Sequence, residues 1–237
     1  MRPHLSMLSQ IWQLLAAGDT AAWHIVGVSL RVSGSSVLLG LLLGLPLGAW
    51  LAVHAFPGRG TLVALLNSLL GLPSVIVGLL VYLLLSRSGP LGGLGLLFSV
   101  PAMILAQTLL TTPLIAAVTR QIVAESWRLH GDPLRSLRLR ALQRVRWLLW
   151  DCRHALLVAA LAGFGRAVSE VGAVMIAGGN IEGYTRTMTT AIALETSKGD
   201  LPLALALGTV LMALVLLVNA AAALLRQHAA ARYGEGA

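Results

Sequence analysis

The sequence predicts an all-α integral membrane protein, and three observations support this fold class. Of the 237 residues, 57% are hydrophobic and only 11% are charged, whereas about a quarter of the residues of a soluble domain are charged. Several apolar stretches reach the roughly 20 residues that a membrane-spanning helix needs. A strongly basic segment interrupts them. The five predicted spans cover about residues 32–53, 62–85, 96–119, 155–178 and 201–225.

We expect these spans to form one transmembrane domain over residues 21–226, followed by a tail at 227–237. Residues 1–20 are too short and too polar to span, so a helix lying flat in the interface is predicted there. Gly71 and Pro73 interrupt the second span, since proline removes a backbone donor. An ordinary kink and an unwound helix beside a transport pathway both remain open. Residues 188–194 are apolar enough to re-enter the membrane.

The basic segment, residues 120–154, carries eight of the 17 Lys and Arg residues and cannot lie in hydrocarbon. Because basic loops stay on the cytoplasmic side, the N-terminus is predicted outside and the C-terminus inside. Residues 133–150 are expected to form one helix with an apolar arc opposite its arginines. Such a face needs a partner, either anionic lipid or a groove on a soluble protein, and the periodicity alone favours lipid.

Arg166 and Glu170 are the only charges inside a predicted span. Their i, i+4 spacing places them on one helix face, where each can neutralise the other. Charges inside a membrane are candidates for function, but a pair that only fixes this helix against its neighbours is nearly as good an interpretation. Glycines on either side allow neighbouring helices to approach closely.

Several function classes are excluded by what the chain lacks. A nucleotide motor would show G-x-x-x-x-G-K-[ST], but the only lysine, Lys198, follows no glycine loop. The single Cys152 excludes an internal disulfide, and the six histidines show no metal-ligand spacing. The basic residues do not alternate with aromatics, which argues against nucleic acid. No catalytic residue, metal or cofactor is therefore expected. A pore-forming subunit, a secondary transporter and a structural membrane subunit remain.

Four stretches resemble the membrane-spanning subunit of type I ABC importers, and within that group the tungstate-type permease. They are FPGRG around Arg59, GLPSVIVGLLVYLLLSRSGPLG at 71–92, AGFGRAVSEVGAVMIAGGN at 162–180 and GYTRTMTTAIALETSKGD at 183–200. The third is similar to molybdate permeases as well, whereas the last resembles the tungstate branch. The family has a glycine where this chain has Arg138, and a later proline that this chain lacks.

The resemblance implies that the basic segment contains a coupling helix that docks on an ATPase subunit, which reverses the preference for lipid. The implied coupling residues are Asp132, Leu134, Leu137, Arg138, Ala141 and Val145. The working unit would contain two copies of this chain in the lipid bilayer, two ATPase subunits and an external oxyanion-binding protein. The cargo would be tungstate, with molybdate as the alternative. A secondary anion transporter and an assembly subunit without a pathway remain as rivals.

The outer loop after the fourth span is rich in hydroxyl groups. Thr185, Thr189 and Thr190 lie near Arg186, and together they could offer hydrogen-bond donors to a passing dianion. Hydroxyls beside a cation would bind the anion weakly enough to release it. The alternative is that the loop only docks the binding protein and that its threonines cap short helices.

Overall fold

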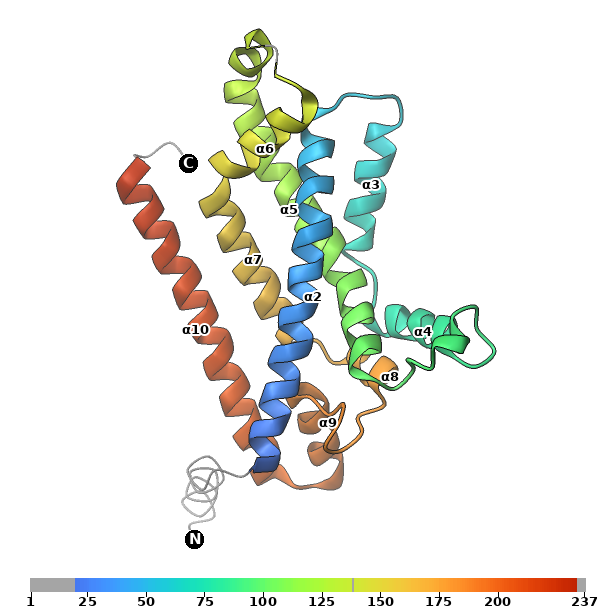
Figure 1. Ribbon diagram of the computed structural model, residues 1–237. Helices are drawn as coiled ribbons and strands as arrows, with labels where there is room; N and C mark the ends of the chain where they lie inside the picture. The colour runs from blue at the N-terminus through green and yellow to red at the C-terminus, as the bar shows by residue number, and fades with distance from the viewer. Residues whose placement is uncertain (1–19, 138, 234–237) are drawn as a thin grey trace. The chain divides into compact units, whose positions relative to one another are not determined.

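A computed structural model describes residues 20–137 and 139–233, and 82% of the chain is helical, with no strand among the described residues. The predicted interfacial helix at residues 1–20 lies almost wholly outside the described residues. The helices, shown in Figure 1, are α2 (Thr20–Val53), α3 (Arg59–Leu69), α4 (Ser74–Leu85), the 3-10 turn η1 (Gly92–Leu94), α5 (Val100–Ser136), α6 (Ala141–Asp151), α7 (Arg153–Val168), α8 (Gly172–Gly178), α9 (Met188–Lys198) and α10 (Leu201–Tyr233).

Three described helices are long and apolar enough to cross a membrane: residues 21–53 of α2, α5, and residues 201–225 of α10. Two further pairs reach that length only together, and both are sharply bent: α3 with α4 by 99°, and α6 with α7 by 73°. The described part of the chain thus holds up to five spans. Length and composition alone support this count.

The predicted span at 62–85 is two helices rather than one. The chain leaves the helix between Leu69 and Ser74, and Pro73 adopts an extended ψ of 127° immediately before α4. A proline ring disfavours the helical conformation of the residue before it, here Leu72, which explains why the break falls at this point. An ordinary kink is therefore wrong, because a bend of 99° separates two distinct helices.

The predicted single helix over 133–150 is also wrong. Helix α5 continues from the membrane span to Ser136, and α6 starts at Ala141. The side-chain oxygen of Gln143 accepts the backbone N–H of Arg140 at 2.8 Å, which satisfies a donor that the first turn of α6 would leave unpaired. The amphipathic pattern is thus divided between the end of one helix and the whole of the next.

The structure also changes two other predictions, for the span at 155–178 and for the segment at 188–194. The span predicted at 155–178 is broken, because α7 ends at Val168 and α8 begins at Gly172. The segment at 188–194 lies in the regular helix α9 rather than in a turn, and its re-entry into the membrane stays a prediction.

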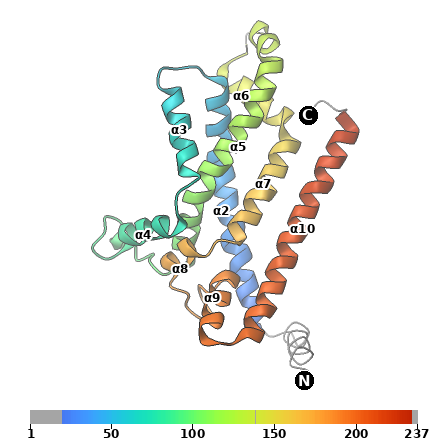
Figure 2. The same ribbon diagram turned by 180° about the vertical axis from the view of Figure 1, so that it is seen from behind.

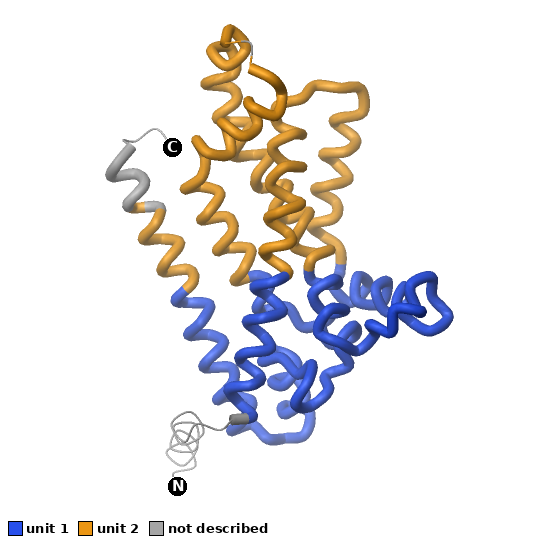
Figure 3. Tube along the Cα trace, in the orientation of Figure 1, with its two compact units in different colours: residues 1–35, 73–107, 166–217 blue, residues 36–72, 108–165, 218–237 orange. Residues whose placement is uncertain are grey.

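The chain forms two compact units, coloured in Figure 3. Of the described residues, unit 1 contains 20–35, 73–107 and 166–217, and unit 2 contains 36–72, 108–137, 139–165 and 218–233. Inside unit 1, Val32 of α2 and Met103 of α5 share an apolar cluster with Val174 of α8. A β-carbon added at Gly78 of α4 would lie 2.8 Å from the Cα of Ala173 in α8, so these two helices touch at backbone distance.

Unit 2 is built on a glycine stripe. Gly40, Gly44 and Gly48 recur every four residues along α2 and face α5, where a β-carbon at Gly44 would lie 2.9 Å from Ile115 Cγ2. Small residues at this spacing let two helix backbones approach closely, which dispersion forces reward in a membrane. Leu66 of α3 packs on Ala116 and Ala117 of α5, and the two helices are seen from behind in Figure 2.

Candidate functional site

The break between α7 and α8 is closed by several hydrogen bonds. Glu170 lies in this break and is 8% exposed. Its Oε1 atom accepts the backbone N–H groups of Val171 and Gly172, both at 3.1 Å. These are donors that a helix start leaves without an internal partner. The carboxylate therefore closes the beginning of α8.

The carbonyl groups freed by the same break find side-chain partners from other helices. Thr189 Oγ1 of α9 donates to the carbonyl oxygen of Glu170 at 2.8 Å. The Nε2 group of Gln107, from α5, donates to the carbonyl oxygen of Ala167. An unpaired carbonyl is costly in an apolar environment, so these two long-range bonds make the broken backbone tolerable.

Arg166 stands on the last turn of α7, and its Nη1 atom lies 3.9 Å from Glu170 Oε2. The expectation that both residues share one helix face is wrong, because α7 ends at Val168 before Glu170 is reached. The arginine side chain is 64% exposed and the glutamate side chain 8%. The closest partners of this carboxylate are backbone donors, and the role of the Arg166–Glu170 pair in positioning the helix stays a prediction.

A small recess, with room for about one water molecule, opens beside this junction. Its polar lining comes from α2, α5, the α7–α8 break and the start of α9, and consists of Ser29, Ser33, Gln107, Glu170, Thr187 and Thr189. The backbone N–H of Met188 donates to Ser29 Oγ at 2.7 Å, which holds α9 against α2. Hydroxyl and amide groups of this kind can both donate to and accept from a polar solute.

The predicted outer-loop residues divide into two groups. Thr189 lines the recess, whereas Thr185, Arg186 and Thr190 are not among its lining residues. Thr190 Oγ1 accepts the backbone N–H of Thr187 at 2.9 Å and so caps α9. Thr185 Oγ1 donates to the carbonyl oxygen of Gly178 at 2.6 Å. The geometry of Thr185 and Thr190 therefore fits the helix-capping alternative.

Helices α4 and α8 each begin at a break in the chain, and their first turns lie against each other in unit 1. A β-carbon at Gly172, the first residue of α8, would lie 2.9 Å from Ser74 Oγ and from Val75 Cγ2 at the start of α4. Two helices that begin at interruptions are thereby packed start against start. Discontinuous helices line substrate sites in many transporters.

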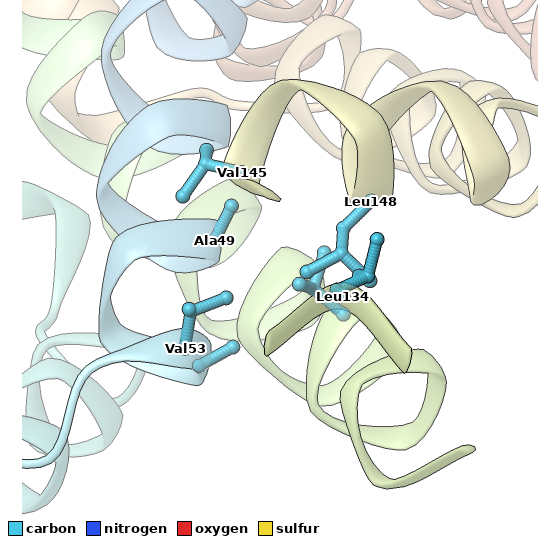
Figure 4. Close-up of a cluster of buried hydrophobic side chains, with 7 residues drawn as sticks. Ala49, Val53, Leu134, Val145 and Leu148 are labelled. Carbon is cyan, nitrogen blue, oxygen red and sulfur yellow. The ribbon is translucent and has the colours of Figure 1, made fainter. Parts of the chain in front are cut away.

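A second candidate region lies in unit 2, at the end of α5 and in α6. Leu134, Val145 and Leu148 are buried in one cluster with Ala49 and Val53 of α2, as Figure 4 shows. Two of the predicted coupling residues, Leu134 and Val145, therefore point into their own chain and cannot form a docking surface. This corrects their predicted role: they hold the segment in place.

Of the other predicted coupling residues, two are exposed and a third is half-buried. Leu137 is 68% exposed, and the side chain of Asp132 is 92% exposed beside Arg135. Ala141 is half-buried at the first position of α6. Arg138 lies outside the described residues. Residues 132, 137 and 141 thus form an accessible tip, and the buried side chains of Leu134 and Val145 hold this tip in place.

A polar cluster links α5 to the end of α6. Ser126 Oγ donates to Asp151 Oδ2 at 2.8 Å, and His130 Nδ1 lies 3.3 Å from the same hydroxyl oxygen. Burial raises the pKa of the neighbouring Cys152 thiol, although its hydrogen bond with Ser126 acts in the opposite direction. Among the described residues, no group of three His, Cys, Asp or Glu side chains could hold a metal ion.

Sequence reasoning missed several of these residues. The Gly40, Gly44 and Gly48 stripe was readable as a repeated G-x-x-x-G pattern. Ser29, Ser33 and Gln107 are polar residues in or beside apolar helices, which marks candidates for a polar site. No local signal connects Ser126 to Asp151, because the two are far apart in the chain.

No protein-family model matches the chain. A 231-residue match to the "Probable anion ABC transporter permease protein" of Haloferax volcanii is 39% identical and covers 94% of this chain and 100% of the relative. The tungstate uptake system permease protein TupB of Peptoclostridium acidaminophilum is 38% identical over 88% of this chain and 91% of its own.

The fold is similar to that of a solved structure. A chain of the MetNI methionine ABC transporter, in an inward-facing conformation, superposes with a TM-score of 0.60 at 18% identity. The match covers 91% of this chain and 96% of that chain. At this identity the likeness concerns the fold alone, and it agrees with the helical architecture described above. From its two near full-length relatives, the chain belongs to the family of ABC transporter permease proteins.

Proposed function

We propose that this chain is the pore-forming permease subunit of an ATP-driven importer for tungstate. The proposal is carried by the near full-length similarity to relatives named for anion transport and tungstate uptake. It adds that an external binding protein delivers the oxyanion and that separate ATPase subunits hydrolyse ATP. The chain itself catalyses no covalent step. Two copies form the pore, with the N-terminus outside and the C-terminus in the cytoplasm.

In this proposal the tip in unit 2 docks on the ATPase. Asp132, Leu137 and Ala141 supply the accessible surface, while Leu134 and Val145 anchor it from inside. An amphipathic element on a rigid base can transmit a displacement, because packed side chains repack between discrete arrangements rather than deform continuously. ATP binding and binding-protein closure would bias the same inward/outward equilibrium.

The recess beside Glu170 is the proposed part of the anion path. Several of its hydroxyls and its amide donate to backbone carbonyls, and in the proposed path they would exchange these partners for a tetrahedral oxyanion, which keeps the anion weakly bound. The carboxylate of Glu170 repels an anion less than its charge suggests, since two backbone N–H groups already donate to it and Arg166 lies nearby.

The deciding experiment is uptake into proteoliposomes that contain this chain and its ATPase, with the binding protein outside and ATP inside. We expect tungstate uptake to require both ATP and the binding protein. Uptake driven by an ion gradient without ATP would identify a secondary transporter. A complex that assembles but never takes up tungstate, molybdate or sulfate would identify an assembly subunit.

The choice between tungstate and molybdate is expected to rest on the binding protein, because the two oxyanions have the same charge and nearly the same shape. Uptake of both in the same vesicles, in the ratio of their affinities for the free binding protein, would support this. A strong preference that persists after exchange for a molybdate-selective binding protein would place selectivity in the permease.

Thr189→Val tests the path, because it keeps the shape of the side chain and removes its hydroxyl; since that hydroxyl also donates to the Glu170 carbonyl oxygen, uptake is measured per folded complex. We expect slower uptake while the binding protein still binds the complex normally. Thr190→Val is the matched control: its hydroxyl caps α9 and lies outside the lining of the recess, so it should lower stability more than it lowers the uptake rate of folded protein. Loss of binding-protein affinity in Thr189→Val would instead indicate a docking surface.

A further inference from the structure

Helix α6 is inclined to the helix that follows it. The bend between α6 and α7 is 73°, and it occurs at Cys152. Helix α7 enters the fourth predicted span, and membrane helices tilt by only about 20° on average from the bilayer normal. With α7 crossing the bilayer, helix α6 would run close to the membrane surface, at the level where α7 enters.

One face of α6 is already occupied. Val145 and Leu148 are buried against α2 and α5 in the cluster of Figure 4. Leu142, Arg146 and Trp150 recur every four residues and form an exposed stripe elsewhere on the helix; Leu142 is 78% and Trp150 70% exposed. The α6 stripe, defined by these three residues, thus combines two large apolar side chains with a cation.

The corner after the stripe adds a second cation to the same surface. The Arg153 guanidinium lies 4.8 Å from the centroid of the Trp150 ring, and its Nη1 donates to the Trp150 carbonyl oxygen at 2.8 Å. Arg144, by contrast, lies near Trp127, 5.8 Å from its ring centroid. The nearby acid, Asp151, accepts the hydroxyl of Ser126. The stripe and its corner therefore carry a positive charge beside an indole ring.

We propose that the α6 stripe and Arg153 bind the headgroup of an anionic phospholipid. Tryptophan and arginine favour the boundary between headgroups and acyl chains, where an indole buries its ring and a guanidinium pairs with a phosphate. An amphipathic helix parallel to the surface presents both at the required depth. The proposal requires that α7 crosses the membrane, and it does not depend on which solute is transported.

The test uses the purified full chain in detergent, titrated with phosphatidylglycerol or phosphatidylcholine whose acyl chains carry bromine, a quencher of tryptophan fluorescence. The difference between the wild type and Trp150→Phe isolates the Trp150 signal. We expect saturable quenching by phosphatidylglycerol at concentrations where phosphatidylcholine has little effect. Each arginine near an anionic surface contributes roughly a fivefold factor in binding, so Arg146→Gln with Arg153→Gln should weaken it roughly 20- to 30-fold.

Arg128→Gln is the matched control, because Arg128 is an exposed cation on α5 that pairs with Glu125 at 3.3 Å. It should leave the titration unchanged. If the double variant misfolds, Arg146→Gln alone keeps the test open, since its exposed side chain can be removed without disturbing the corner. Equal quenching by both lipids, or arginine variants without effect, would overturn the proposal. Protection of Trp150 by added ATPase in nanodiscs would overturn it in favour of a protein interface.

Discussion

Unit 1 and unit 2 are each stabilised internally by a different kind of contact. In unit 1 the backbone is interrupted beside Glu170, and the interruption is closed by hydrogen bonds from Thr189, Gln107 and the glutamate itself. In unit 2 the chain also breaks, between α5 and α6 and again at Cys152, but a glycine stripe and an apolar cluster join its helices. Hydrogen bonds depend on geometry, whereas apolar packing depends mainly on volume. Unit 1 should therefore be sensitive to single polar changes, and unit 2 to changes in size.

The largest expected effect distinguishes the exposed tip of unit 2 from its buried base. Leu137→Asp should abolish uptake and ATPase co-purification, because it places a charge on the proposed docking surface. The protein should still insert, because this side chain is 68% exposed. Leu134→Ala should instead destabilise the fold by about 2–5 kcal/mol, as for other buried leucines. Uptake assays and melting temperatures in detergent measure the two effects.

Leu137→Met is the control for the tip, since it keeps an apolar side chain of similar volume and should retain uptake. Normal transport and normal ATPase binding by Leu137→Asp would contradict the docking role.

The next effect tests whether the backbone donors or the ion pair matter more at Glu170. Glu170→Ala leaves two N–H groups without their acceptor and should cost about 1–3 kcal/mol of stability. Arg166→Ala removes only an ion pair 3.9 Å long whose arginine is 64% exposed, so it should cost under about 1 kcal/mol. Thermal unfolding in detergent gives both values.

Glu170→Gln keeps an oxygen acceptor and should recover most of the stability that Glu170→Ala loses. If the double alanine variant were more stable than Glu170→Ala alone, the mutual pair would dominate and the capping interpretation would be wrong.

A smaller effect tests the glycine stripe of unit 2. A β-carbon at Gly48 would lie 2.8 Å from Thr119 Cβ, so Gly48→Ala should force α2 away from α5 and cost about 1–3 kcal/mol. Gly34→Ala lies on the same helix in open space and should be neutral or stabilising by about 0.5–1 kcal/mol through helix propensity. A fall in melting temperature of the same size for both variants would contradict the packing argument.

The smallest effect concerns Cys152, at the end of α6. Burial raises the pKa of its thiol, so at pH 8 less thiolate is present in the folded protein than in the unfolded chain. Alkylation by a maleimide should therefore be slow in the folded protein and fast in SDS. Ser126→Ala removes the hydrogen bond that lowers this pKa, and should slow the reaction at pH 8 further. A faster reaction in Ser126→Ala would show that access, rather than the pKa, controls the rate.

The sequence by itself determined the class of the protein, because the number and length of apolar stretches need no tertiary information. The basic segment of 120–154 and the four motifs were equally readable, since charge and local spacing are properties of the chain. The break at Pro73 was also open to prediction, because a proline acts on its own neighbours.

Only the tertiary structure decided which members of a predicted arc face outward. Leu134 and Leu137 look equivalent on a helical wheel, but contacts with Ala49 and Val53 bury the first and leave the second exposed. The same holds for Glu170, whose partners include a hydroxyl from α9. Such outcomes rest on contacts between residues distant in the chain, and no local periodicity contains them.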